Sequence, residues 1–353
     1  MYERVMEPEP GIGPARCDLR RHRADTMAAT PPMMEAYLSM MRASALIAAE
    51  RIGLFEALAG GFVAPDALAH RLDVSEIGLG RLADLLVETG HLERRETSLG
   101  NTPATMRWFT SRGEVDFSAG LAWTADAWTI MSELPDAVRR GAPVQLLWDR
   151  MDADPALGMR FSRYMRAFAE HLTPDLLRLV DLPADAARLL DLGGSHGIHA
   201  TSLCQQYPRL HSVIIDLESA LRDTETSIDA MGLGDRISVR PADIRACDWG
   251  GEYDVILYLS VAHNLYAHEN QRIFRHARSV LRPGGKLVIH DYPRETTPAL
   301  FGAAFGLTLM VETGTRAFTY AELWGMLTKA GFSTIARHVL LPAEKGTIII
   351  AQA

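Results

Sequence analysis

The chain has 353 residues, a formal net charge of −8 and a hydrophobic content of 48%, so we expect two folded domains. Its acidic balance gives little attraction for phosphate backbones or anionic lipid, which argues against a nucleic-acid or membrane partner. The cysteines Cys17, Cys204 and Cys247 are widely spaced. They predict neither a disulfide framework nor a metal site, as expected of a protein in the reducing cytoplasm. No signal-peptide pattern and no run of about 18 apolar residues is evident.

The N-terminal third predicts a tail followed by a helical domain. Residues 1–32 mix Pro, Gly, Arg and acidic residues without periodicity, so we interpret them as a mobile tail. A helical pattern covers 32–58, and 62–95 predicts two helices and a short hairpin, "GHLERRETSLGNTP", in the order of a winged helix. We expect a winged-helix-like domain over 33–115, and its apolar helices suggest a homodimer.

Residues 116–180 predict a helical linker that contributes to a substrate pocket. The segment up to residue 150 is rich in tryptophan and ends near the turn "RRGAPV". An amphipathic helix follows in "GMRFSRYMRAFAEHL". Thr173 is a suitable N-cap and Pro174 a suitable first helical residue, so we expect a new helix to begin there.

The region 181–353 predicts an α/β domain, because short apolar segments alternate with helical ones as in βαβ units. The predicted strands are "ARLLDLG", "HSVIIDL", "ISVRPAD", "YDVILYL", "KLVIHDY", "IARHVLL" and "GTIIIAQA". We therefore expect a Rossmann-like, mostly parallel seven-stranded sheet, with the last two strands forming an antiparallel pair.

A glycine-rich turn follows the first of these strands. The strand ends near Asp191, and Gly193, Gly194 and Gly197 lead into a helix. Glycines allow the sharp bend and let a ligand approach where a Cβ would collide. The spacing is neither GxGxxG nor a P-loop, so the turn alone is weak evidence for a nucleotide site.

Acids at the next two strand ends strengthen this prediction. Asp216 ends the second strand, where a carboxylate can accept both ribose hydroxyls of an adenosine, and Asp243 ends the third. Asp243 or the neighbouring Ile244 amide could meet the adenine edge. Either acid alone could be a helix cap, but together they predict a nucleoside site at the carboxyl edge of the sheet. Leu217 and Leu259 complete the predicted cofactor contacts.

The motifs in this order resemble those of class I methyltransferases. "LLDLGGSHG" is similar to their motif I, "VIIDLESAL" to their second motif, and "GLGDRISVRPADI" and "LRPGGKLVIHDY" to later ones. The resemblance covers residues 36–353 and is closest to the dimeric plant-type and actinobacterial O-methyltransferases. It implies S-adenosyl-L-methionine as cofactor, S-adenosyl-L-homocysteine as product, and an N-terminal domain that dimerises and helps to wall the substrate pocket.

The same resemblance implies catalytic residues. His263 stands where the family has a catalytic His after the fourth strand, and Asp291 where an acid can orient it. The pattern departs from the family beyond this point, because its second acid aligns with Ala317 and Glu312 is near but differently placed. His263 could instead only line the pocket. His268 and His290 are weaker candidates for the base.

Large apolar residues predict a pocket for a bulky, aromatic acceptor, although each could also belong to the core. The predicted substrate contacts are Trp148, Phe161, Met165, Tyr266, Phe305 and Met310, with Trp128, Phe301 and Leu309 as further candidates. The expected reaction is in-line methyl transfer to oxygen, with transfer to carbon or nitrogen as the alternative.

Parts of the sequence also suggest three other functions. A DNA-binding regulator would need basic residues on its second helix, but "SEIGLGRLADLLVETG" carries one Arg beside three acids. A nicotinamide dehydrogenase would need the GxGxxG spacing that is missing here. A methyltransferase-like enzyme that binds the cofactor for decarboxylation, hydroxylation or cyclisation stays open at this point.

Overall fold

The computed structural model describes residues 31–353, so the tail predicted over 1–32 lies almost wholly outside the described residues. The chain forms two compact units, which meet in sequence between Thr105 and Met106. The sequence-based boundary at residue 115 falls ten residues later. Each unit is described separately below.

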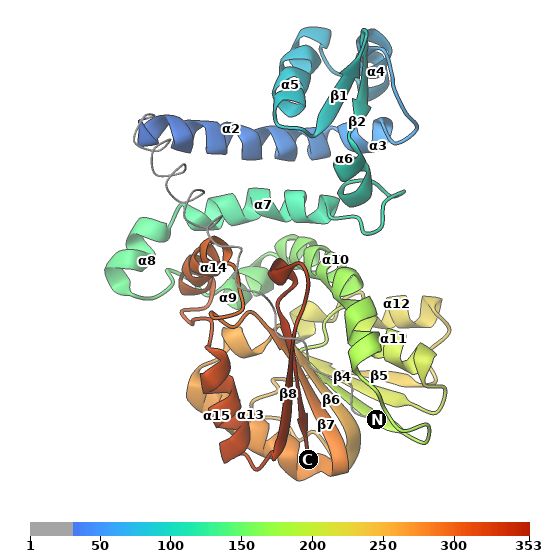
Figure 1. The fold of residues 1–353 in the computed structure, drawn as a ribbon, viewed down its shortest axis with the longest axis vertical. Coiled ribbons are helices and arrows are strands. Elements are labelled where there is room, and N and C mark those ends of the chain that lie inside the picture. Colours follow the sequence, from blue (N-terminus) through green and yellow to red (C-terminus); the bar gives the residue numbers. More distant parts are fainter. Residues whose placement is uncertain (1–30) are drawn as a thin grey trace, which may run out of the picture. The chain divides into compact units, whose positions relative to one another are not determined.

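The N-terminal unit consists of helices and one hairpin (Figure 1). The helix predicted over 32–58 is interrupted at Gly53, which has a φ of 72° that most residues disfavour. The predicted hairpin forms, with Leu92 opposite Asn101. The elements are α2 (Pro32–Arg51), α3 (Leu54–Ala57), α4 (Pro65–Leu72), α5 (Glu76–Glu88), β1 (Leu92–Arg95) and β2 (Ser98–Asn101).

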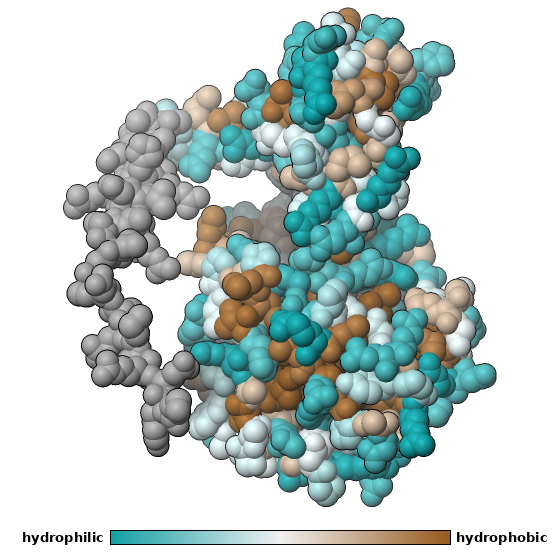
Figure 2. Space-filling view, turned by 45° about the vertical axis from the view of Figure 1, so that its right-hand side comes forward, coloured by the Kyte–Doolittle hydropathy of each residue, from teal (hydrophilic) through white to brown (hydrophobic). Residues whose placement is uncertain are grey.

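The core of this unit is formed by leucines that alternate with polar residues along its helices, as the amphipathic pattern predicts. Leu54, Leu68, Leu79 and Leu86 are at most 2% exposed. The start of α2 differs, because several of its hydrophobic side chains lie at the surface among polar ones (Figure 2). Those exposed by 40% or more are Met33, Met34, Tyr37, Leu38 and Met40.

Helices open the second unit. The helix start predicted at Thr173 is wrong, because α10 (Pro155–Leu179) continues through Thr173 and Pro174. The Thr173 hydroxyl donates to the Ala169 carbonyl one turn earlier and contacts His199 Nδ1. Thr173 is therefore held inside a continuous helix by local and tertiary bonds that propensity does not reveal. The helices are α6 (Pro103–Trp108, which begins before the unit boundary), α7 (Ser118–Met131), α8 (Leu134–Arg140), α9 (Leu147–Ala153) and α10 (Pro155–Leu179).

A seven-stranded sheet in the order β5-β4-β3-β6-β7-β9-β8 forms the centre of this unit. The first five strands of this order are parallel, and β9 is antiparallel to β8, as predicted, and also to β7. The strands are β3 (Arg188–Leu192), β4 (His211–Asp216), β5 (Ile237–Pro241), β6 (Tyr253–Leu259), β7 (Leu281–Asp291), β8 (Thr334–Val339) and β9 (Thr347–Gln352).

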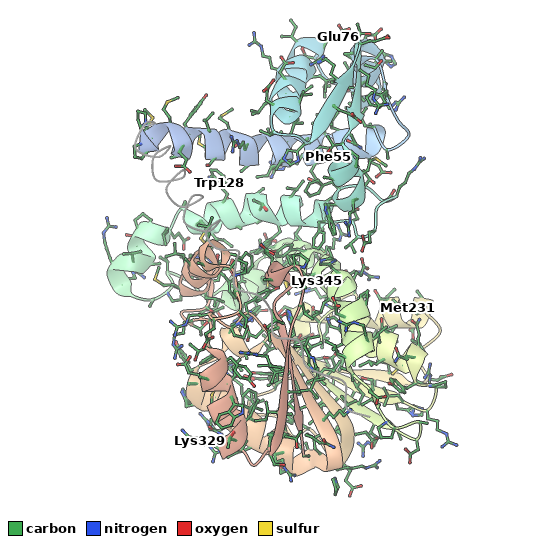
Figure 3. All side chains as sticks on the ribbon, viewed as in Figure 1. Phe55, Glu76, Trp128, Met231, Lys329 and Lys345 are labelled. Carbon is green, nitrogen blue, oxygen red and sulfur yellow. The ribbon has the colours of Figure 1, made fainter. Side chains whose placement is uncertain are left out.

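Helices cover both faces of this sheet and create two buried cores. On one face, α10, α11 (Ile198–Gln206) and α12 (Thr224–Ala230) pack against β3 and β4. On the other, α13 (Ala267–Val280) and α15 (Tyr320–Lys329) pack against β6 and β7. The helix α14 (Ala299–Glu312) packs with α7, α8 and α9 instead. An ion pair from Lys345, in the turn before β9, to Asp175 joins the C-terminal turn to α10 (Figure 3).

Among the described helices, none combines the length and the apolar character needed to cross a bilayer.

Candidate active site

A large cavity opens at the carboxyl ends of the parallel strands, and all of its lining residues belong to the second unit. In the sheet β4 lies on one side of β3 and β6 on the other. The connections that follow β3 and β6 therefore lead away from each other and leave a crevice at the carboxyl ends of these strands. The cavity measures about 1020 Å³, which exceeds the range of about 300–1,000 Å³ that one ligand usually occupies. Its lining divides into two parts of different chemistry.

One part of the cavity, the strand-end crevice, is formed by Asp191, Gly193, Gly194, Asp216 and Asp243. Gly193 has a φ of 74°, and a Cβ there would lie 2.5 Å from a methyl group of Val261. At Gly194 a Cβ would lie 2.6 Å from the Asp191 carboxylate. The turn thus requires glycine at both positions. Gly197 does not line the cavity; its φ of 72° starts α11 behind the turn.

Two neighbouring strands, β3 and β4, each bring an acid into this crevice, the buried Asp191 and the half-buried Asp216. The Asp216 carboxylate accepts hydrogen bonds from the Ser195 and Leu217 amides at 2.9 and 2.7 Å. Burial raises the pKa of Asp216 to about 6, and burial together with the Asp216 charge raises the pKa of Asp191 to about 7. Asp191 Oδ2 has no hydrogen-bond partner among the described residues. A cationic or hydrogen-bonding ligand would offset the cost of burying these acids.

Asp243 lines the crevice as predicted, but its carboxylate is already engaged. The Arg245 guanidinium binds both of its oxygens at 2.8 to 3.1 Å and also contacts Glu269. The sequence did not indicate this pairing, because the side chains of residues two positions apart can point in different directions. The neighbouring Ile244 and the predicted contacts Leu217 and Leu259 also line the crevice.

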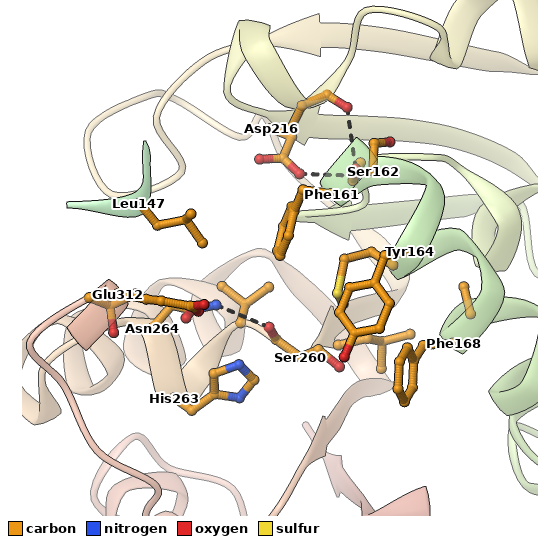
Figure 4. A pocket seen from close by; sticks show the side chains of 18 of the residues that line it. Leu147, Phe161, Ser162, Tyr164, Phe168, Asp216, Ser260, His263, Asn264 and Glu312 are labelled. Carbon is orange, nitrogen blue, oxygen red and sulfur yellow. Dashed lines mark hydrogen bonds between the residues drawn. The ribbon is translucent and has the colours of Figure 1, made fainter. Parts of the chain in front are cut away.

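The second part of the cavity, the apolar chamber, is formed by Trp148, Phe161, His263, Phe305 and Glu312. Figure 4 shows Phe161, His263 and Glu312 around it. His263 follows β6 in a short 3₁₀ turn, Ala262–Asn264, and is 7% exposed. Asn270 of α13 holds this turn by donating to the carbonyls of Ala262 and Leu265. The Phe305 ring meets the His263 ring edge-on at 5.0 Å.

His263 and Asp291 form a buried pair. His263 Nδ1 lies 2.8 Å from Asp291 Oδ1, and the His263 amide donates to Asp291 Oδ2 at 3.1 Å. Burial alone would raise the pKa of Asp291, but the adjacent His263 keeps it below its ordinary value. An ionised carboxylate at Nδ1 places the imidazole proton there, so Nε2 carries the free lone pair. This is the tautomer that can accept a proton in the chamber.

Most of the predicted acceptor contacts meet in this chamber. Trp148, Phe161, Met165, Tyr266 and Phe305 line it, as do the further candidates Phe301 and Leu309. Met310 does not line the cavity; it packs with α7 and α9 on the other side of α14. Trp128 is 46% exposed and also lies outside the lining, because α7 directs Trp123 inward in its place.

The two weaker histidine candidates have different positions. His268 is exposed and stacks against Tyr266 at 6.0 Å. His290 is buried and lines the cavity, but its ring nitrogens contact Ser260 Oγ at 2.9 Å and the Lys345 carbonyl at 2.7 Å. Both nitrogens of His290 are thus engaged, whereas His263 Nε2 has no hydrogen-bond partner among residues 31–353 and stands next to the Phe305 ring.

Sequence reasoning missed the polar groups that other helices bring into the chamber. Tyr164 of α10, Tyr292 after β7 and Glu312 at the end of α14 all line it. Burial raises the pKa of Tyr164 to about 12 and that of Glu312 to about 7. The available signal for Glu312 was a lone acid closing the apolar helix "LFGAAFGLTLMVE", since such an acid needs a reason to be buried.

The fold and the cavity together define an α/β enzyme with a nucleoside-type crevice beside an aromatic chamber. Residues 131–333 match the O-methyltransferase domain family. The chain belongs to this family and is a methyltransferase whose methyl donor is S-adenosyl-L-methionine. This donor combines an adenosine with a cationic amino-acid end, and the crevice fits both parts. Asp216 is held in place by the Ser195 amide, and Asp191 has a carboxylate oxygen without a hydrogen-bond partner among the described residues.

Known proteins of this kind resemble the chain along much of its length. It is 26% identical over 306 residues to a 3-hydroxy-5-methyl-1-naphthoate 3-O-methyltransferase of Streptomyces sahachiroi, which covers 84% of this chain and 87% of that protein. It is 29% identical over 195 residues to an L-tyrosine C(3)-methyltransferase of Streptomyces lavendulae, 53% of this chain and 52% of that protein. The structure of human N-acetylserotonin methyltransferase in complex with SAM has a TM-score of 0.78 at 19% identity, covering 91% of this chain and 96% of that one.

Proposed function

We propose that this methyltransferase acts on a hydroxyl oxygen of a bulky aromatic compound from secondary metabolism. The observation that carries the proposal is the His263–Asp291 pair, which projects a free imidazole nitrogen into an aromatic chamber next to the strand-end crevice. The relative that acts on a naphthoate hydroxyl supports a fused-ring phenol as the acceptor class.

Transfer to carbon is the second candidate, and the relative named as a tyrosine C(3)-methyltransferase favours it. A phenolate is nucleophilic at its oxygen and also at the adjacent ring carbon. The same base could therefore serve both reactions, and the orientation of the ring in the chamber would decide between them. The larger match to an O-methyltransferase favours oxygen.

In the proposed cofactor site, Asp216 holds the ribose hydroxyls and Leu217 packs beside them. The Ile244 amide, with Asp243 fixed by Arg245, borders the adenine edge, and Leu259 lies at the end of β6. The glycine turn and Asp191 receive the amino-acid end. When bound, S-adenosyl-L-methionine supplies an electrophilic methyl group on a sulfonium.

The residues of the chamber then prepare the acceptor. His263 Nε2 accepts the phenolic proton, while Asp291 fixes the tautomer and stabilises the resulting imidazolium. Phe305 and Phe161 position the ring and exclude water, which strengthens electrostatic interactions in the chamber. General-base catalysis of this kind contributes roughly 10²–10⁴ to the rate.

Calorimetric titration of the wild type and of Asp216→Ala with S-adenosylmethionine, S-adenosylhomocysteine and NADH tests the cofactor site. We expect micromolar binding of the two sulfur compounds to the wild type, loss of that binding in the variant, and no binding of NADH. Turnover with a panel of naphthols, followed by S-adenosylhomocysteine formation, tests methyl transfer. Conversion of acceptor without S-adenosylhomocysteine would indicate decarboxylation, hydroxylation or cyclisation instead.

We also propose that the N-terminal unit is a winged-helix-like dimerisation domain. The exposed hydrophobic side chains at the start of α2, Met33, Tyr37 and Met40 among them, support a second copy of the chain as the partner. The free thiols Cys204 and Cys247 support the expected reducing cytoplasm. Light scattering at micromolar concentration that gave a monomer mass would contradict the dimer.

A further inference from the structure

Glu312 is a buried acid that the mechanism above does not use. It is the last residue of α14, is 8% exposed and lines the apolar chamber. Figure 4 shows its side chain and that of His263 on one side of the pocket, with Tyr164 and Phe168 on the other. The Glu312 carboxylate makes no hydrogen bond and no ion pair with any residue of the described range 31–353.

A carboxylate in this position is costly unless a ligand engages it. Burial raises the pKa of Glu312 to about 7, although the nearby His263 acts in the opposite direction. Of the lining residues nearest to it on α14, Phe305 and Leu309 have no donor, and the Thr308 hydroxyl donates to the Ala304 carbonyl at 3.3 Å. Natural proteins keep a buried acid without a hydrogen-bond partner mainly at functional sites. The position of Glu312 therefore indicates a contact with the acceptor.

The charges of the lining define which acceptor group suits this acid. Asp149 and Asp152 also line the chamber, both from α9 and both exposed. The Lys and Arg side chains of the lining are Arg245 and Lys345, and both are held in ion pairs by other acids. A carboxylate on the acceptor would thus meet acids without a free cation, whereas a hydroxyl or amino group could donate to Glu312.

We propose that Glu312 is a specificity-determining residue that accepts a hydrogen bond from a second hydroxyl or amino group on the aromatic acceptor, away from the oxygen that is methylated. This inference rests on the proposed function. It adds that the acceptor is a bicyclic or larger phenol carrying a further hydrogen-bond donor, and that carboxylate-bearing analogues are disfavoured.

Binding of four matched probes in the presence of saturating S-adenosylhomocysteine tests this assignment. The probes are 1-naphthol, 1,5-dihydroxynaphthalene, 5-amino-1-naphthol and 5-hydroxy-1-naphthoic acid. They share one phenol and differ in the second group. They are titrated into the wild type, Glu312→Gln, Glu312→Leu and, as a matched control, Asp149→Asn, which removes an exposed acid from the same lining.

We expect the wild type to bind the dihydroxy or the amino probe about tenfold or more tightly than 1-naphthol, the range for a hydrogen bond to a charged group, and to bind the acid most weakly. The probe with the larger gain in affinity over 1-naphthol shows whether Glu312 prefers a hydroxyl or an amino group as its donor. In Glu312→Leu the affinities of 1-naphthol and of the two probes with a second donor should converge to within about threefold. Glu312→Gln keeps an acceptor oxygen and should retain part of the preference for these donor probes, and Asp149→Asn should retain all of that preference.

Equal affinities in the wild type, a preference that survives in Glu312→Leu, tightest binding of the acid, or no binding of any probe would each overturn the assignment. The affinity for S-adenosylhomocysteine serves as the separate control. If it is unchanged in all variants, the fold and the cofactor site are intact and the failure concerns Glu312 alone. If the wild type does not bind S-adenosylhomocysteine, the proposed function itself fails.

Discussion

The strand-end crevice and the apolar chamber are two parts of one cavity, but they are built in different ways. The crevice is formed by consecutive strand ends and a glycine turn, so its residues follow from chain order and sheet topology. The chamber collects side chains from α9, α10 and α14 and from the turn after β6. A site fixed by backbone geometry suits a constant ligand, whereas a site fixed by helix packing can change with a few substitutions.

The largest effect on turnover should come from His263→Ala, which tests the chamber independently of the crevice. The variant removes the free nitrogen in the chamber and leaves the crevice untouched. We expect the turnover number for a phenolic acceptor to fall by roughly 10²–10⁴, with the affinity for S-adenosylhomocysteine within twofold of the wild type. A rate loss below tenfold in single-turnover measurements would exclude a base role and leave His263 as a lining residue.

Glu312→Gln should raise stability in a pH-dependent way. The pKa of Glu312 rises from 4.5 to about 7 on folding, so the folded state holds this proton more tightly, and stability falls as the pH rises from 4.5 to 7. Well above pH 7 the variant should gain about 3 kcal/mol in free energy of unfolding, and close to zero at pH 4.5. Asp191 and Asp216 titrate in the same window but are present in both proteins, so urea unfolding at pH 5, 6, 7 and 8 isolates Glu312. A gain that does not depend on pH would contradict this assignment.

Asp291→Asn should have a smaller effect on turnover, about 10- to 100-fold, by analogy with the loss of a partner that orients a histidine. The amide can no longer stabilise the imidazolium, so the acid limb of the pH–rate profile should move to lower pH. The shift distinguishes this role from simple damage to the fold. Asp254→Asn, a strand residue remote from the cavity, is a suitable control. An unchanged pH profile would indicate that Asp291 only supports the turn.

The smallest effect is expected for Arg245→Met, which acts on the crevice. Arg245 is exposed, and its pairs with Asp243 and Glu269 should contribute no more than about 1 kcal/mol. If the Ile244 amide carries the adenine contact, the affinity for S-adenosylhomocysteine should change by less than about threefold. A tighter complex by tenfold or more would show that Asp243 binds the ligand once it is released from Arg245.

The sequence predicted the strands of the sheet well but only some residues of the apolar chamber, because local patterns determine strands and contacts between distant segments determine the chamber. Each predicted strand is present, because the short apolar segments and the glycine turns between them depend on the local geometry of the chain. Strand β7 begins at Leu281, five residues before the predicted start at Lys286, because Leu281 still pairs with Tyr253 and the intervening "RPGG" forms an irregularity in the ladder.

The misses concern contacts between segments far apart in the chain. Thr173 continues α10 because of its bond to His199, and Met310 points away from the cavity because of how α14 packs. Glu312 reaches the chamber although the family position for the second acid is Ala317, which is buried at 4% exposure. Such outcomes depend on the rotation of one helix, which one-dimensional periodicity does not fix.

The unpartnered oxygen of Asp191 has a consequence for the thermodynamics of ligand binding. With a pKa of about 7, this carboxyl is partly protonated at neutral pH before any ligand arrives. A positively charged group placed beside it would favour the ionised form, and the displaced proton would pass to the buffer. The heat measured on binding would then contain the ionisation enthalpy of that buffer. Affinity for the methyl donor and for its sulfide product, which carry the same ammonium group, would rise with pH through neutrality, so the protonation of one carboxyl would set how tightly either compound is held.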